Sequence, residues 1–176
     1  MKTLRPEQLK SYLDAADARG VLPMFYLELV SGLRKGELVA LLWDDLDIQN
    51  RTVSVSKQYI KNPSGKLTLS RPKTETSVRR VSIPREAVDL LIQEHEKHPD
   101  NPYMFPSPIT GEMYYPDSVV KLHEKILKDA GLEHIRFHDG CIKIGLNQKH
   151  PHSKGRTDLV LFLFYKHKGG KNEEYS

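Results

Sequence analysis

The chain has 176 residues, of which 38% are hydrophobic and 28% are charged. This length and composition are typical of one folded domain and exclude an intrinsically disordered chain. No apolar run is long enough to span a bilayer and no signal-peptide pattern opens the chain, so we expect a cytoplasmic protein with no membrane partner. A single cysteine, Cys141, excludes an internal disulfide.

Positive charge is concentrated in two blocks, although the net charge is only +4. Residues 51–85 hold nine Lys or Arg and one acid, and residues 143–171 hold seven and one. A merely soluble surface would scatter its charge evenly, whereas such blocks indicate a polyanion partner, most economically double-stranded DNA. We expect four basic residues of the first block to contact that DNA: Lys57, Arg71, Arg79 and Arg80.

Apolar residues recur at helical spacing in five stretches of the chain. Prolines near their starts and glycines after their ends mark several of the boundaries. The second stretch, residues 22–30, is apolar on nearly every side, which predicts a buried helix. The predicted helices span residues 6–19, 22–30, 34–42, 85–98 and 116–130.

Three short stretches between the third and fourth helices have the pattern of strands. Polar and apolar residues alternate over 52–56, 67–70 and 78–83, and turn-forming residues fill 61–66. The predicted fold class is therefore α+β: a mainly helical domain with a small three-stranded antiparallel sheet.

Arg34 lies between two glycines in the sequence SGLRKGEL. Gly32 can close a helix in the left-handed conformation, and Gly36 lets the backbone approach a neighbour closely. A guanidinium beside the free N–H groups of a helix start suits a phosphate. The residues alone equally allow Arg34 to pair with Glu37 or Asp44 on a solvated face.

Three stretches, in order, resemble the catalytic domain of the tyrosine recombinases, the phage integrase family. They read SGLRKGEL with the following LLWDDLD, then PKTETSVRRVSIP, then EHIRFHD. The resemblance implies cofactor-free DNA breakage and rejoining through a 3′-phosphotyrosyl intermediate, the chemistry by which mobile elements recombine and integrate. It also implies that Arg34 and His138 bind the scissile phosphate and that Lys73 protonates the departing 5′ oxygen. Without the resemblance, Lys73 would be read as an ordinary phosphate contact on a basic hairpin.

The chain departs from the family pattern after residue 139. Cys141 stands where the family requires a second phosphate-binding arginine. Neither Tyr165 nor Tyr175 has the flanking residues of the family's nucleophile. Loss of one charge-stabilising donor and of the nucleophile predicts impaired or absent catalysis. Two hypotheses follow: a DNA breaking-and-rejoining enzyme with an unrecognised nucleophile in its tail, or a non-catalytic DNA-binding remnant of an integrase.

The departure also predicts the domain organisation. We expect residues 1–139 to form an incomplete integrase-like catalytic domain and residues 140–176 an atypical basic and apolar tail. Missing helices would leave apolar surface exposed and favour self-association. We expect no metal site, because His150, His152 and Cys141 lack the paired spacing of zinc ligands.

Overall fold

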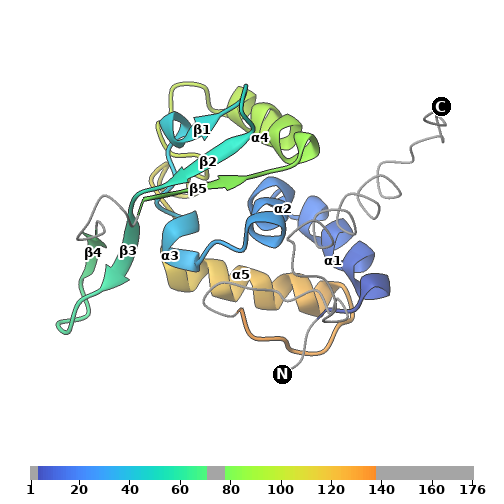
Figure 1. Cartoon of the computed structure of the whole chain (residues 1–176). Coiled ribbons are helices and arrows are strands. Elements are labelled where there is room, and N and C mark those ends of the chain that lie inside the picture. Colours follow the sequence, from blue (N-terminus) through green and yellow to red (C-terminus); the bar gives the residue numbers. More distant parts are fainter. Residues whose placement is uncertain (1–3, 71–77, 138–176) are drawn as a thin grey trace, which may run out of the picture.

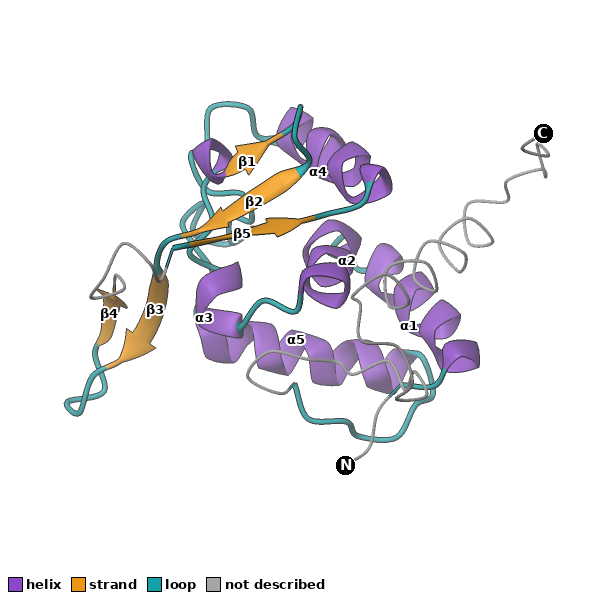
Figure 2. Ribbon diagram, in the orientation of Figure 1, coloured by secondary structure: helices purple, strands orange, loops and turns teal. Residues whose placement is uncertain are grey.

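The computed structural model describes residues 4–70 and 78–137, and Figures 1 and 2 show its arrangement. The helices are α1 (Pro6–Ala18), α2 (Leu22–Ser31), α3 (Lys35–Leu38), α4 (Arg85–Lys97) and α5 (Pro116–Asp129), with a 3-10 turn at Trp43–Asp45. The strands are β1 (Leu46–Asp47), β2 (Thr52–Val55), β3 (Gln58–Lys61), β4 (Leu67–Ser70) and β5 (Arg79–Ser82).

Helix α2 lies at the centre of the fold, packed against α1 on one side and α4 on the other (Figure 1). Every residue from Leu22 to Val30 is buried, as the apolar run predicted. Helix α5 closes the helical part from below by packing against α1 and α3. The predicted bounds of α1, α2, α4 and α5 are confirmed to within one or two residues.

The strands form two separate antiparallel sheets. One has the order β1-β2-β5, with Val53 opposite Val81, and the other is the hairpin β3-β4, with Tyr59 opposite Leu69. Asn62 shapes the hairpin turn, because its Oδ1 accepts the Lys66 N–H at 2.8 Å. The hairpin projects from the body of the molecule beyond β2 and β5 (Figure 1).

The fold class is confirmed, but the membership of the three-stranded sheet differs from the prediction. Residues 67–70 pair with β3 in the hairpin, and the short β1 takes the third place in the sheet instead. Strand β1 has two residues, too few to show any alternation, and β3 carries two adjacent apolar residues, so neither strand has a period-2 pattern.

The predicted helix over 34–42 is wrong in length, since α3 ends at Leu38. Local turn bonds continue as far as the Leu41 N–H, and the main chain then bonds to a distant segment: the Met104 N–H donates to the Leu41 carbonyl, and the Trp43 N–H donates to the Pro102 carbonyl, both at 3.1 Å. Tertiary hydrogen bonds have replaced helical ones here, and the apolar spacing of the sequence did not distinguish the two.

Candidate functional site

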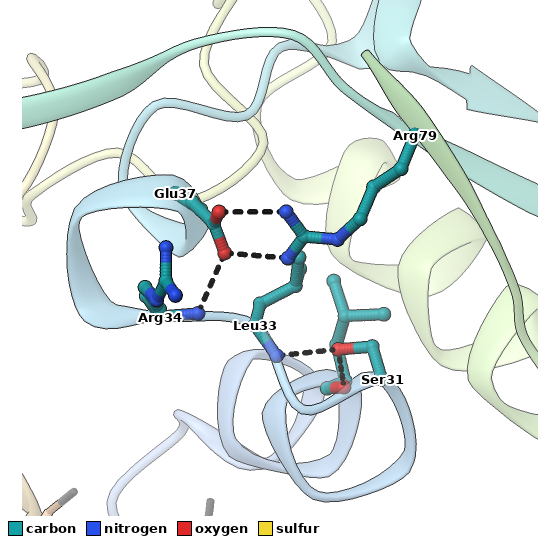
Figure 3. A network of polar contacts seen from close by, with 6 residues as sticks. Ser31, Leu33, Arg34, Glu37 and Arg79 are labelled. Atoms are coloured by element: carbon teal, nitrogen blue, oxygen red, sulfur yellow. Dashed lines mark hydrogen bonds and ion pairs between the residues drawn. The ribbon is translucent and has the colours of Figure 1, made fainter. Parts of the chain in front are cut away.

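The turn that carries Arg34 is set by the end of α2. Gly32 adopts the left-handed conformation with a φ of 66°, and its N–H donates to the Glu28 carbonyl at 2.8 Å. Leu33 is then fully buried, whereas Arg34 has extended backbone and an exposed side chain. Ser31 also stabilises the turn, because its hydroxyl accepts the Leu33 N–H (Figure 3). The buried Leu33 thus fixes a turn whose next side chain faces solvent.

Glu37 is the buried anchor of this turn. Its side chain is 6% exposed, and Oε2 accepts the backbone N–H of Arg34 at 2.9 Å. The guanidinium of Arg79 donates to the same carboxylate through both of its terminal nitrogens, each at 2.8 Å. Figure 3 shows the Arg79 fork aimed at the carboxylate from β5. A bidentate pair of this kind fixes geometry as well as charge, so it joins the Arg34 turn to the three-stranded sheet.

Glu37 stays ionised in this environment. Burial alone would raise the pKa of Glu37, but hydrogen bonds from Arg79 and from the Arg34 N–H, with the charges of both arginines, lower it below its usual range. The same pairing raises the pKa of Arg79. The carboxylate and the Arg79 guanidinium therefore neutralise each other, and the positive charge of Arg34 is left over.

The Arg34 guanidinium forms no ion pair with any residue in 4–70 or 78–137. Glu37 is held by the Arg34 main chain and by the side chain of Arg79, so the pairing of two side chains that the spacing allowed is not formed. Asp44, the other acid considered from the sequence, is likewise not paired with Arg34. The turn presents an exposed, permanently charged fork of donors to solvent.

Two lysines beside the turn share one carboxylate. Lys35 of α3 and Lys61 of β3 both contact Asp117 in the first turn of α5, the former at 3.3 Å between Nζ and Oδ1. The Lys61 hydrogen bond is the main reason that the pKa of Asp117 is lowered. Lys57, a predicted DNA contact, forms a 2.6 Å ion pair with Asp45 in which both side chains are largely buried, and its contact with DNA stays a prediction.

Gly36 brings the hairpin against the Arg34 turn. A Cβ at this position would overlap the backbone carbonyl oxygen of Tyr59. Gly36 makes the close backbone approach that its sequence context predicted, and the partner is β3 of the hairpin rather than a ligand. With the Lys61–Asp117 ion pair, this contact docks the base of the hairpin onto α3 and α5.

Substitution of Gly36 by alanine is expected to displace the hairpin, because the overlapping atom belongs to the backbone and cannot swing aside. We expect a destabilisation of about 1–3 kcal/mol and faster amide hydrogen exchange in β3. Gly131→Ala is the matched control, because Gly131 has a φ of 65° and no neighbour near its missing Cβ. That variant should lose about 1 kcal/mol through backbone strain with exchange in β3 unchanged. Equal exchange in β3 for both variants would contradict the docking role of Gly36.

The structure brings together some of the predicted site residues. Arg34 and Arg79 meet at Glu37, whereas Arg80, the next residue along β5, points to the opposite face of the strand and is exposed. Arg80 forms no ion pair within the part of the chain that the structure describes, and its assignment as a DNA contact stays a prediction. The remaining predicted residues lie outside the described residues: Arg71, Lys73 and His138, with Cys141, His150, His152, Tyr165 and Tyr175 of the tail.

Sequence reasoning missed two acids of the site. Glu37 was considered as a partner of the Arg34 side chain, but its position three residues after the first residue of the turn is that of a capping-box glutamate, which bonds to the backbone N–H. That local signal was available. Asp117 lies 56 residues from Lys61 and 82 from Lys35, and no local pattern links them.

Two classes of feature are absent from residues 4–70 and 78–137. None of the helices there combines the length and apolar character needed to cross a membrane. The same residues contain no cluster of three or more His, Cys, Asp or Glu side chains that could hold a metal ion.

Comparison with known proteins finds an integrase and a recombinase-like protein among the relatives. The ICEBs1 integrase of Bacillus subtilis strain 168 is 30% identical over 152 residues, covering 79% of this chain and 40% of the relative. A protein described as tyrosine recombinase XerC-like, from Caldanaerobacter subterraneus subsp. tengcongensis, is 24% identical over 160 residues, covering 78% and 41%. The chain thus spans about two fifths of the length of these curated relatives.

A solved structure and a family profile point to the same kind of protein as these relatives. The Tn1549 transposon integrase, solved in complex with a circular intermediate DNA, superimposes with a TM-score of 0.65 at 20% identity, covering 97% of this chain and 54% of that one. This likeness shows the fold. The profile of the phage integrase family matches residues 2–140, well over half of the sequence. The chain therefore belongs to the phage integrase family.

Proposed function

We propose that this chain binds double-stranded DNA as the core of a phage-integrase-type recombinase, holds a backbone phosphate at Arg34, and does not complete strand breakage. One observation carries the proposal: the Arg34 guanidinium is exposed and unpaired among the described residues, on a turn that Glu37 and Arg79 hold rigid. An arginine whose backbone is fixed loses little freedom when it binds a phosphate bidentately.

The roles of the other predicted residues follow from the chemistry that the family performs. In the proposal, Arg34 neutralises one phosphoryl group together with His138, and Lys73 supplies a proton to the departing oxygen. Lys73 follows β4 in the chain, so the hairpin that Gly36 docks would deliver it to the site. Cys141 contributes no positive charge where a second arginine would stand, which removes a donor worth about 3 kcal/mol of transition-state stabilisation.

DNA binding by this site is expected to depend on Arg34 and on salt. Affinity for a duplex should fall steeply between about 50 and 200 mM salt, and Arg34→Ala should flatten the dependence of log affinity on log salt by about 0.9. Arg85→Ala is the matched control, because Arg85 is also exposed but begins α4, away from the turn (Figure 1). Arg79→Ala is unsuitable, since it would also remove the partner of Glu37. Equal slopes for the Arg34 and Arg85 variants would refute a phosphate site at Arg34.

Complete strand breakage by a tail tyrosine is the second candidate function, and the family membership favours it. We expect no covalent adduct when the chain is incubated with a nicked DNA substrate that traps phosphotyrosyl intermediates, because no recognisable nucleophile is present. Denaturing electrophoresis provides the measurement. An adduct that disappears in Tyr165→Phe or in Tyr175→Phe would overturn the proposal and identify the nucleophile.

A further inference from the structure

A buried chain of hydrogen bonds joins three distant segments at the lower side of the fold. The Tyr12 hydroxyl of α1 lies 2.8 Å from Nδ1 of His123 on α5, and Nε2 of His123 lies 2.9 Å from the carbonyl oxygen of Ile135. Tyr12 and His123 are fully buried and Ile135 is 7% exposed. These two hydrogen bonds link the first helix, through α5, to the last segment that the structure describes.

The partners of His123 define its tautomer. A carbonyl oxygen only accepts, so Nε2 must carry the hydrogen and donate it to Ile135. Nδ1 of the neutral ring then accepts from the Tyr12 hydroxyl. Burial lowers the pKa of His123 to about 4, so the ring is neutral at physiological pH and both of its nitrogens are satisfied.

The surroundings of His123 are those of an apolar side chain. Phe25 lies nearly parallel to the ring with centroids 6.4 Å apart, and Phe137 meets it edge-on at 5.4 Å. A phenylalanine or leucine would fill this space without burying polar atoms. Burial of an imidazole is unfavourable unless its nitrogens are bonded, so packing alone does not account for histidine at this position.

The Ile135 carbonyl belongs to a segment without regular structure. Residues 133–137 lie outside every helix and strand, and no backbone–backbone hydrogen bond joins them to another described residue. Ile135 and Phe137 point inward while Arg136 between them is exposed. The bond from His123 is a buried contact between α5 and this main chain, whereas the His134–Glu124 contact to α5, at 3.6 Å, joins two exposed side chains.

We propose that His123 is a positioning residue: its Nε2–H holds the main chain at Ile135 and sets where the chain leaves the core, three residues before His138. The inference rests on the proposed function only in taking His138 as a phosphate ligand. A one-residue slip of the segment would exchange the buried side chains of Ile135 and Phe137 with the exposed side chain of Arg136.

Two substitutions separate positioning from packing. In His123→Gln the side-chain amide nitrogen can occupy the place of Nε2 and donate to Ile135, whereas in His123→Asn the amide reaches only the place of Nδ1, beside Tyr12. Both variants are neutral and differ by one methylene. We expect the Gln variant to keep DNA affinity within about twofold and the Asn variant to lose about tenfold, because a freed segment must be ordered again when DNA binds. Amide exchange at Arg136 and Phe137 should accelerate in the Asn variant alone.

The results expected for the two His123 variants can be told apart from a failure of the phosphate site at Arg34. Equal exchange at residues 136 and 137 in the Gln and Asn variants, or equal DNA affinity, would overturn the positioning role. If exchange and affinity both separate the variants while Arg34→Ala binds normally, the segment is positioned as inferred and the phosphate site at Arg34 fails. Should neither variant fold, nitrogen-15 spectra of the unaltered chain decide: a hydrogen on Nε2 of His123 is expected, and a hydrogen on Nδ1 alone would exclude the bond to Ile135.

Discussion

A Glu37→Ala variant is expected to unfold with a free energy about 2–3 kcal/mol lower than the unaltered chain. The change leaves the Arg34 N–H without its acceptor and the Arg79 guanidinium without its counter-ion. Removal of one partner of a fully buried ion pair costs about 3–5 kcal/mol. The lower value applies here because the Arg79 side chain is 46% exposed and can regain water. Denaturant unfolding followed by circular dichroism measures the loss.

Two further variants test the cause of this loss. Glu37→Gln retains an oxygen for the Arg34 N–H but lacks the charge and the second acceptor for Arg79, so its loss should be intermediate. Asp44→Ala removes an exposed acid from the neighbouring turn and should change stability by less than about 0.5 kcal/mol. If Glu37→Ala were as harmless as Asp44→Ala, the turn would not depend on the Glu37–Arg79 pair. We also expect weaker DNA binding by Glu37→Ala, since a loosened turn no longer presents Arg34 in one place.

Mild acid is the second condition with a large expected effect. The pKa of His123 is about 4 in the folded chain, because of burial, against about 6.5 when unfolded. Between these values the unfolded state binds a proton that the folded state does not, so stability falls as the pH is lowered through this window. The contribution of His123 is fully present above about pH 6.5, and about 3 kcal/mol is lost by pH 4.

The His123→Gln variant isolates this effect, because glutamine does not titrate and keeps a donor for Ile135. Unfolding free energies measured from pH 7 to pH 5 should fall more steeply for the unaltered chain, by about 1.4 kcal/mol per pH unit below pH 6. Carboxylates with lowered pKa values, such as Glu37 and Asp117, lose their contribution only at lower pH and do so in both proteins. Parallel pH profiles for the two proteins would contradict a neutral, buried His123.

Much of the fold followed from local patterns in the sequence. The long helices were predictable because apolar periodicity, N-terminal proline and C-terminal glycine agree at α2 and α5. Apolar periodicity did not predict the conformation where hydrogen bonds to distant residues determine it, as at Leu41, whose carbonyl accepts the Met104 N–H. It also failed for β1, which is held by its pairing with β2 rather than by any alternation of its own.

The site was predictable in part, for similar reasons. The Arg34 turn is local, so its glycines and its exposed arginine could be read from eight consecutive residues. The bidentate pair between Glu37 and Arg79 spans 42 residues, and no local pattern predicts it, while the contact of Arg79 with DNA stays a prediction. Only the three-dimensional arrangement shows that one basic residue supports the turn while another faces solvent.

The carboxylate that Lys35 and Lys61 share has a consequence for measurements on DNA. A phosphate that approaches either lysine must compete with Asp117, so binding would exchange one anionic partner for another and release fewer counter-ions than the number of lysines contacted. The salt slope of the unaltered chain would then undercount its phosphate contacts. Removal of the competitor, as in Asp117→Asn, would raise affinity and steepen the slope together, although the substitution takes away a negative charge rather than adding a contact.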